Sequence, residues 1–301
     1  MDRLQQMRVF VAVAEEQGFA AAARRLVQSA PSVTRAVAAL EAHLGVKLLN
    51  RTTRYVRTTE AGQRYLEDAR RILAELDAAE EAVAGVNAAP RGVLTLTAPV
   101  LFGRQFVMPA VVAYLERYPE VQVDAMFVDR TVSLLEEGID VGVRIGELSD
   151  SRMRAVPVGA VRRILVASPA YLARHGIPRS PSDLTSHTLI STSAGSFSSG
   201  WRFRGADGEH TLRVRPRLIT TTNDAAIEAA LHGLGITSVL SYQPAAEVAA
   251  GRLQILLEAY ELAARPIHII HREGPRPATR VRTFIDLLRD RLRAEPALAA
   301  G

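Results

Sequence analysis

The feature that most constrains this sequence is a pair of short helical segments within residues 18–45, joined by a tight turn. The first segment, residues 20–26, is mostly Ala and Arg, so a neighbouring helix can approach it closely. Ser29 is placed to cap the second segment, and Pro31 suits the first turn of a helix because its missing N–H costs nothing there. Gly45 supplies the expected end of that helix. The sequence therefore predicts two short consecutive helices.

Apolar residues repeat with helical spacing both before and within this pair. The first stripe consists of Leu4, Met7, Val11 and Ala14, and the second consists of Val33, Val37, Leu40 and Leu44. Gly18 is expected to end the first helix in a left-handed conformation. Two short helices in this order fit the major groove of double-stranded DNA, with Thr34 and Arg35 left off the apolar stripe. Arg35 would then contact either a guanine edge or a phosphate.

A basic segment follows at residues 50–58, where arginines alternate with the strand-favouring residues Thr, Tyr and Val. We therefore expect a hairpin, whose arginines could enter the minor groove or bind the DNA backbone; the sequence leaves both open. Residues 1–58 carry a formal net charge of +5, whereas residues 59–89 carry −4. The DNA-binding surface is thus expected at the N-terminus, and the acidic segment should not lie along DNA.

The motifs of this region, taken together, resemble those of the LysR-type transcriptional regulators. The matching residues are Ala22-Ala23-Arg24-Arg25-Leu26, the run from Ser29 to Val37, Leu40-Glu41, Leu44-Gly45, Leu48-Leu49, Arg51 and Thr58-Thr59-Glu60-Ala61-Gly62. The resemblance implies a winged helix-turn-helix that binds DNA. The implied DNA-binding residues are Ser29, Ala30, Pro31, Ser32, Thr34 and Arg35 at the start of the recognition helix, with Arg51 and Arg54 in or beside the wing.

Two positions depart from the pattern of that family. Ala30 stands where the family often has a base-contacting Gln, and Ala20 stands where a Ser or Thr often caps a helix and touches phosphate. Either departure would narrow or shift the DNA sequence that is bound.

The acidic segment at residues 59–89 is predicted to be one long helix that runs to about Asn87. Thr59 can cap it, and Glu60 suits the positive end of its dipole. Two patterns with helical spacing run along it: Leu66, Ala69, Leu73, Leu76, Glu80 and Val83 at steps of three and four, and Tyr65, Ile72, Ala79 and Val86 at steps of seven. The alternative is burial against its own domain. We favour a dimerisation seam because the heptad spacing persists for nearly three repeats.

After the helix-breaking residues 88–92, strand and helix patterns alternate as in an α/β fold. Strands are expected at residues 93–97, 121–128, 140–145, 164–167, 189–191, 218–220 and 267–270, and helices at 106–118, 131–138, 224–231, 243–250 and 279–293. We infer an α+β multidomain chain. Its parts are a winged helix-turn-helix head (1–58), a linker and dimerisation helix (59–89) and a two-lobed α/β effector domain (90–301), with lobe I at about 90–162 and 266–301 and lobe II at about 163–265.

The C-terminal half also resembles the effector domain of the LysR-type family, which is itself similar to periplasmic solute-binding proteins. The matching residues are Ala98-Pro99, Phe102-Gly103, Tyr118-Pro119-Glu120-Val121, Glu137-Gly138-Ile139-Asp140 and Arg144-Ile145-Gly146. The resemblance implies that a small molecule binds between the lobes. The implied effector-binding residues are Val100, Leu101, Phe102, Asp129, Arg144, Trp201, Phe203 and Asn223.

An anionic effector, such as an organic acid, is the expected ligand. The helix after Gly103 would direct its N-terminal amides into the cleft, and Arg144 would add positive charge. Val100 weakens this expectation, because relatives often place a hydroxyl thereabouts to hold a carboxylate. Trp201 and Phe203 could stack on an aromatic acid, but core packing is an equally good interpretation.

Several other classes are disfavoured by the sequence. There is no cysteine, no Gly-x-Ser-x-Gly elbow, no phosphate-cradling glycine loop and no His-Glu-x-x-His motif, so we expect neither an enzyme nor a cofactor. His268 and His271 favour a structural role over a metal site. A solute-binding protein would lack the basic head and need an export signal, and an α/β enzyme with a helical appendage ranks lower still. No segment has the apolar length of a membrane span, so we expect a cytoplasmic protein.

The expected partners follow from these assignments. Double-stranded DNA and a small-molecule effector come first, and a dimer would present two recognition helices to an interrupted inverted repeat. The family resemblance further implies a tetramer built from two dimers and leaves RNA polymerase as an additional candidate partner. Effector binding is expected to shift the two lobes and thereby change the bending of the DNA.

Overall fold

The computed structural model describes residues 2–51, 56–83, 89–148, 153–193, 200–205, 208–272 and 277–299. The chain divides into two compact units, with the main boundary between Ala89 and Pro90. Within the described residues, no helix is both long and apolar enough to cross a membrane. The same residues contain no cluster of three or more His, Asp or Glu side chains suited to a metal ion.

The first unit is built from helices and one short hairpin. In chain order these are α1 (Arg3–Glu15), α2 (Phe19–Arg25), α3 (Ala30–Leu44), β1 (Leu49–Arg51), β2 (Val56–Thr58) and α4 (Glu60–Val83). Strands β1 and β2 pair antiparallel, with Leu49 opposite Thr58 and Arg51 opposite Val56. The predicted order of three helices, a hairpin and a long helix is therefore confirmed.

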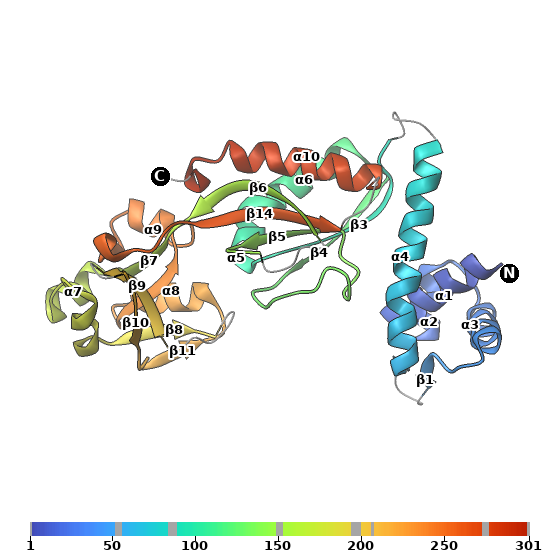
Figure 1. Cartoon of the computed structure of the whole chain (residues 1–301), viewed down its shortest axis with the longest axis horizontal. Coiled ribbons are helices and arrows are strands. Elements are labelled where there is room, and N and C mark those ends of the chain that lie inside the picture. The colour runs from blue at the N-terminus through green and yellow to red at the C-terminus, as the bar shows by residue number, and fades with distance from the viewer. Residues whose placement is uncertain are drawn as a thin grey trace. The chain divides into compact units, whose positions relative to one another are not determined.

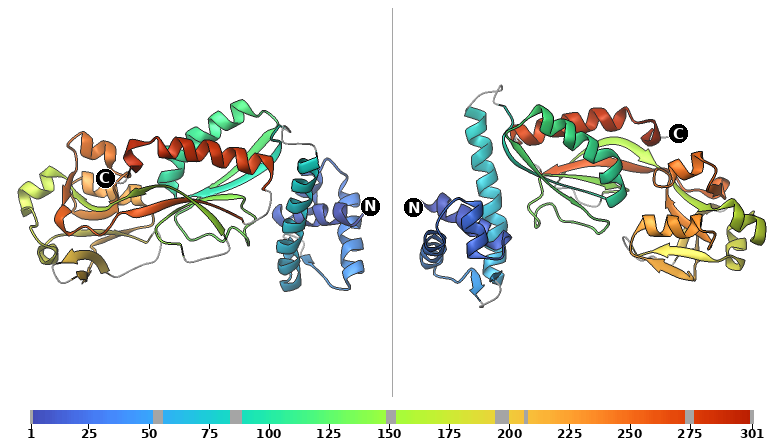
Figure 2. Two further views of the ribbon diagram at one scale, coloured as in Figure 1. Left: turned by 45° about the horizontal axis from the view of Figure 1, so that its top comes forward. Right: turned by 180° about the vertical axis from the view of Figure 1, so that it is seen from behind.

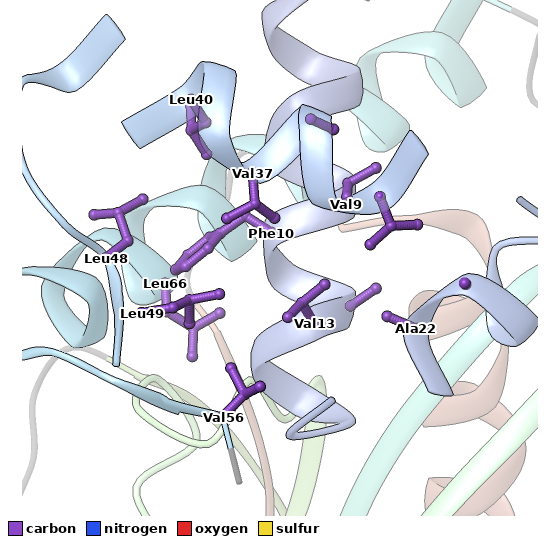
Figure 3. Close-up of a cluster of buried hydrophobic side chains, with 14 residues drawn as sticks. Val9, Phe10, Val13, Ala22, Val37, Leu40, Leu48, Leu49, Val56 and Leu66 are labelled. Carbon is purple, nitrogen blue, oxygen red and sulfur yellow. The ribbon is translucent and has the colours of Figure 1, made fainter. Parts of the chain in front are cut away.

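The helices of this unit converge on one apolar core (Figure 3). Phe10 and Val13 of α1 and Val37 of α3 are fully buried in it. Leu48 and Leu49 bring the start of the hairpin into the same core, and Leu66 brings in α4; all three are labelled in Figure 3. The hairpin and α4 are thus held by the same apolar contacts that hold the three helices together.

Three details of the sequence prediction for the head are corrected by the structure. The buried face of α1 is centred on Val9, Phe10 and Val13, whereas three of the four residues of the predicted stripe are only partly buried. Leu44 is 37% exposed and does not belong to the core. Gly18 is extended and caps α2, and the residue in the left-handed conformation is its neighbour Gln17.

Helix α4 begins where the sequence predicts. The Thr59 hydroxyl oxygen accepts a hydrogen bond from the Gly62 amide at 2.9 Å, which satisfies one of the amides of the first turn. Gly62 lies so close to Leu48 that an added Cβ would overlap the Leu48 carbonyl, so this position needs glycine. The described part of α4 ends at Val83, and the predicted continuation to Asn87 lies outside the described residues.

The second unit contains two lobes, each with a five-stranded sheet (Figure 1). In lobe I the strands are β3 (Gly92–Ala98), β4 (Val121–Phe127), β5 (Val141–Ile145), β6 (Met153–Val161) and β14 (Arg265–Arg272), in the spatial order β4-β3-β5-β14-β6. Strand β3 pairs parallel with β4 and β5, and β14 pairs antiparallel with β5 and β6. Two helices, α6 (Met108–Arg117) and α10 (Thr279–Arg293), cover one face of the sheet, as Figure 2 also shows.

Lobe II has the spatial order β11-β8-β12-β7-β13. Its strands are β7 (Arg163–Ala167), β8 (Leu189–Thr192), β11 (Leu218–Thr220), β12 (Ile236–Leu240) and β13 (Gln254–Leu256). Its helices are α7 (Pro169–His175), α8 (Asn223–Leu231) and α9 (Ala245–Ala249), with the short 3₁₀ turns η2 (Pro181–Ser186) and η3 (Glu258–Tyr260). A separate hairpin, β9 (Gly200–Gly205) and β10 (Gly208–Arg213), packs its inward-facing side chains into this lobe.

The predicted helix at residues 131–138 is wrong: residues 131–133 have no regular structure and residues 134–138 form turns. Arg144 donates to the Val132 carbonyl, and Val132 and Leu134 are buried against Ile270, so tertiary contacts override the local helical pattern. The sequence pattern also missed β6, β12, β13 and the β9–β10 hairpin. The remaining predicted strands and helices are present, α10 with the predicted bounds.

Candidate functional site

The first candidate site is the N-terminal end of α3. The Ser29 hydroxyl oxygen accepts a hydrogen bond from the Ser32 amide at 3.3 Å, and Pro31 occupies the first turn. The Thr34 hydroxyl donates to the Ala30 carbonyl at 2.9 Å. At the other end, Gly45 has a φ of 69°, the left-handed conformation that ends a helix. The start of α3 is thus fixed in position by its own side chains.

The side chains predicted to bind DNA from α3 all lie outside the core. Ala30, Pro31 and Arg35 are exposed, and Ser32 and Thr34 are partly exposed. Within the part of the chain that the structure describes, Arg35 makes no ion pair. A guanidinium without a protein partner at the exposed start of a helix is available for a phosphate or a guanine edge.

The hairpin beside α3 is anchored by a buried carboxylate. Glu41 of α3 is 3% exposed, and its Oε1 accepts hydrogen bonds from the amides of Leu48 at 2.9 Å and Leu49 at 3.1 Å. Its Oε2 pairs with Lys47 Nζ at 3.0 Å. Burial raises the pKa of Glu41, but the hydrogen bonds from Lys47, Leu49 and Leu48 outweigh it and hold the pKa below its ordinary value. The carboxylate therefore stays charged and fixes the first strand of the hairpin to α3.

Sequence analysis did not assign a role to Glu41. The sequence did contain a sign of burial, because Glu41 follows Val37 by four positions and so lies on the apolar face of the helix. Of the two arginines predicted for the wing, Arg51 lies on β1, opposite Val56. Arg54 lies outside the described residues, so its placement in the wing stays a prediction.

Ion pairs link the other helices of the head. Glu15, at the end of α1, pairs with Arg25 of α2 at 2.7 Å and with Arg70 of α4 at 2.9 Å. Arg70 and Glu15 are only 18% and 26% exposed, so this pair is shielded from solvent better than an ordinary surface pair. The Arg25 guanidinium is therefore held by an ion pair within the protein.

The second candidate site lies where β3 meets the short helix α5 (Val100–Phe102). The Val100 amide donates to Asp129 Oδ1 at 3.0 Å, which joins the loop after β3 to the loop after β4. The helix begins at Val100, not at Gly103, and continues through a π-helical turn, η1 (Gly103–Val107), into α6. Asp129 thus caps the first amide of the helix, and among the described residues the next two amides, of Leu101 and Phe102, have no acceptor.

An aromatic cluster lies beside this helix and joins the two lobes. Phe102 and Phe106 come from lobe I, and Tyr242 follows β12 of lobe II. The Tyr242 ring centroid is 5.5 Å from that of Phe102 and 5.7 Å from that of Phe106. Tyr242 is 3% exposed, and burial, with a smaller contribution from the negative charge of Asp129, raises its pKa above the ordinary range. Neither Phe106 nor Tyr242 was predicted, because nothing in their local sequence marks a contact between lobes.

The other residues predicted for the effector site have partners within the protein. Arg144 donates to the Val132 carbonyl, so its side chain holds the loop after β4. Asn223 starts α8, and its Oδ1 accepts a hydrogen bond from the Thr192 hydroxyl at 3.4 Å. Phe203 is 6% exposed in the core of lobe II, which agrees with the alternative of core packing. Trp201 is half-buried against the same core.

Comparison with known families accounts for both halves of the chain. Residues 4–63 match the model of the bacterial regulatory helix-turn-helix proteins of the lysR family. Residues 87–293 match the model of the LysR substrate binding domain. The first match contains α3 and the hairpin, and the second contains both lobes.

Individual relatives match along nearly the whole chain. The HTH-type transcriptional regulator CrgA of Neisseria meningitidis is 32% identical over 290 residues, which cover 96% of each chain. PtxR of Pseudomonas aeruginosa is 34% identical over 300 residues, which cover 97% of this chain and 94% of PtxR.

Solved structures of two regulators show the same fold. The structure of CrgA, a LysR-type transcriptional regulator, has a TM-score of 0.61 at 30% identity and covers 96% of this chain and 98% of CrgA. The structure of AphB, a virulence activator of Vibrio cholerae, has a TM-score of 0.62 at 27% identity and covers 95% of this chain and 98% of AphB.

Proposed function

The chain belongs to the LysR family of transcriptional regulators, with a DNA-binding helix-turn-helix and an effector-binding domain, and we propose that it binds an operator through the start of α3 while a small organic acid bound between the lobes controls the response. In this proposal the protein acts in the cytoplasm as a dimer that assembles further into a tetramer. RNA polymerase is its additional partner at the promoter.

The observation that carries the DNA-binding part is the exposed N-terminal end of α3. Pro31 and Arg35 are exposed there, Thr34 is partly exposed, and the helix is fixed by its Ser29 cap and by the core. Arg51 and Arg54 would extend the contact from the hairpin to the DNA backbone or the minor groove. Ala30 offers no hydrogen bond to a base, so base readout would depend mainly on Thr34 and Arg35.

The effector part is supported by the geometry around α5. We propose that the acid accepts hydrogen bonds from the amides of Leu101 and Phe102, while Val100 and the Phe102 ring contact its apolar part. Asp129, Asn223 and Trp201 would limit the size and polarity of the ligand. Because Phe102 also contacts Tyr242 of lobe II, a ligand that displaces this ring would change the closure of the lobes.

The test is quantitative DNA binding by the full chain to the intergenic DNA beside its own gene. Arg35→Ala should reduce the preference for operator over random DNA about tenfold or more, as loss of one bidentate base contact does. Arg282→Ala, an exposed arginine on α10, is the matched control and should leave the preference unchanged. If Arg35→Ala retained the full preference for the operator, Arg35 would have no part in base readout.

A further inference from the structure

A surface hollow lies where the chain crosses between the two lobes of the second unit. Its volume is about 300 Å³, and Ala160, Arg162, Ser241, Ala245, Ala264 and Ala297 are among the residues that line it. Arg162 joins β6 to β7, and Ala264 directly precedes β14; these are the two crossovers visible in Figure 1. Ala297 lies in η4 (Pro296–Leu298), a short 3₁₀ turn after α10.

Two hydrogen-bond donors stand at the wall of this hollow. Arg162 and Ser241 are held side by side, because the Ser241 amide donates to the Arg162 carbonyl at 2.8 Å and the Arg162 amide donates to Ser241 Oγ at 3.2 Å. One nitrogen of the Arg162 guanidinium, Nη1, pairs with Glu261 at 3.1 Å. Within the described residues, the other guanidinium nitrogens and the Ser241 hydroxyl proton have no acceptor. A guanidinium and a hydroxyl with donors to spare are suited to a carboxylate.

The rest of the lining is apolar and small. Five of the nine lining residues are alanines from four separate segments, and Val161 and Tyr242 complete the lining. The volume is at the lower end of the range for small-molecule sites, so a ligand of about ten non-hydrogen atoms or fewer would fit. We propose that this hollow is a second ligand site, distinct from the site around α5, and that it binds a short-chain monocarboxylate through Arg162 and Ser241.

A ligand in this hollow would act on the arrangement of the lobes. It would contact both crossovers and the turn after α10 at once, so its binding energy would differ between open and closed lobes. Tyr242 lines the hollow and also contacts Phe102 and Phe106. The second site is therefore coupled to the first through one side chain.

The test measures binding of hexanoate to the full-length protein by ligand-observed NMR, with hexanamide as the neutral analogue. Ala264→Leu fills the hollow, and Ala263→Leu, its exposed neighbour outside the lining, is the matched control. Arg162→Gln removes the charge. We expect the Kd for hexanoate to rise at least about tenfold in Ala264→Leu and in Arg162→Gln and to stay within about twofold of the parent in Ala263→Leu. Hexanamide should not compete with hexanoate.

Three results would overturn the proposal. The first is a hexanoate affinity in Ala264→Leu equal to that of the parent, and the second is equally strong binding of hexanamide. The third is loss of hexanoate binding in Asn223→Ala, which would place the acid at the α5 site. If Arg162→Gln fails to fold, as circular dichroism would show, the comparison of Ala264→Leu with Ala263→Leu still decides the question.

Discussion

A buried charge at a single residue, Glu41, determines how the hairpin sits against the recognition helix. One carboxylate oxygen satisfies two amides, of Leu48 and Leu49, and the other pairs with Lys47. The two partners of the ion pair differ in exposure: the Glu41 side chain is 2% exposed and the Lys47 side chain is 77% exposed. The hydrogen bonds to the amides should therefore matter more than the ion pair.

Glu41→Ala should destabilise the start of the hairpin by about 3 kcal/mol, because it leaves two buried amides without an acceptor. Lys47→Ala, which removes only the exposed half of the ion pair, should cost less than about 1 kcal/mol. Hydrogen exchange of the Leu48 and Leu49 amides in the full chain measures both. Equal protection in the two variants would show that the amides do not depend on Glu41.

The same residue predicts a dependence on pH. Its folded-state pKa is lowered, so its stabilising contribution is present above the ordinary carboxyl pKa of 4.5 and is lost as the pH falls through the folded-state value. Glu41→Gln lacks this titration. The difference in hairpin protection between the parent and Glu41→Gln should be largest near about pH 7 and should shrink below about pH 4. A difference that is constant over this range would contradict the prediction.

At the scale of the element, the predicted seam of helix α4 is buried in its first part and only partly buried further along. Leu66 is 6% exposed and Ala69 is fully buried in the single chain, and Leu66 belongs to the core of the head. Leu73 and Leu76, further along the predicted seam, are only partly buried. The first part of the predicted seam thus serves the head itself, and we propose that the dimer contact starts near Leu73.

Substitutions in α4 should therefore separate folding from association. Leu66→Ala should destabilise the head by about 2–4 kcal/mol, as other buried leucines do when a cavity is created. Leu73→Glu should leave the head folded and weaken dimerisation about tenfold or more, because a charge would enter an apolar seam. Asp68→Ala, on the exposed side of α4, is the control. Sedimentation and hydrogen exchange give the two readouts, and a stable Leu73→Glu dimer would place the seam elsewhere.

At the scale of the molecule, aromatic contacts join the two lobes of the second unit. Tyr242 from lobe II packs on Phe102 and Phe106 from lobe I, directly beside the proposed effector site. Among the described residues, its hydroxyl oxygen accepts only one long hydrogen bond, from Gln243 Nε2 at 3.5 Å. The packing of the Tyr242 ring, and not its hydroxyl group, should therefore hold the two lobes together.

Tyr242→Ala should loosen the lobes, while Tyr242→Phe should behave like the parent. Loss of a buried aromatic ring lowers the free energy of unfolding by about 3–5 kcal/mol, whereas loss of a weakly hydrogen-bonded hydroxyl lowers it by less than about 1 kcal/mol. Small-angle scattering of the full chain and hydrogen exchange over residues 100–107 would show a wider, less protected second unit in Tyr242→Ala alone. A similar change in both variants would indicate that the hydroxyl is needed.

The sequence by itself determined the elements that depend on local signals. Ser29, Pro31 and Gly45 delimit α3 through its own backbone, and Thr59 starts α4 in the same way, so these helices of the head were predictable. Only the tertiary structure decided features that depend on contacts distant in sequence. Contacts with Arg144 and Ile270 replace the predicted helix at residues 131–138. Phe203 packs in the core of lobe II, and Tyr242 contacts Phe102 across the lobes. The reason is physical: a cap or a turn acts within a few residues, whereas packing depends on which distant side chains the fold brings together.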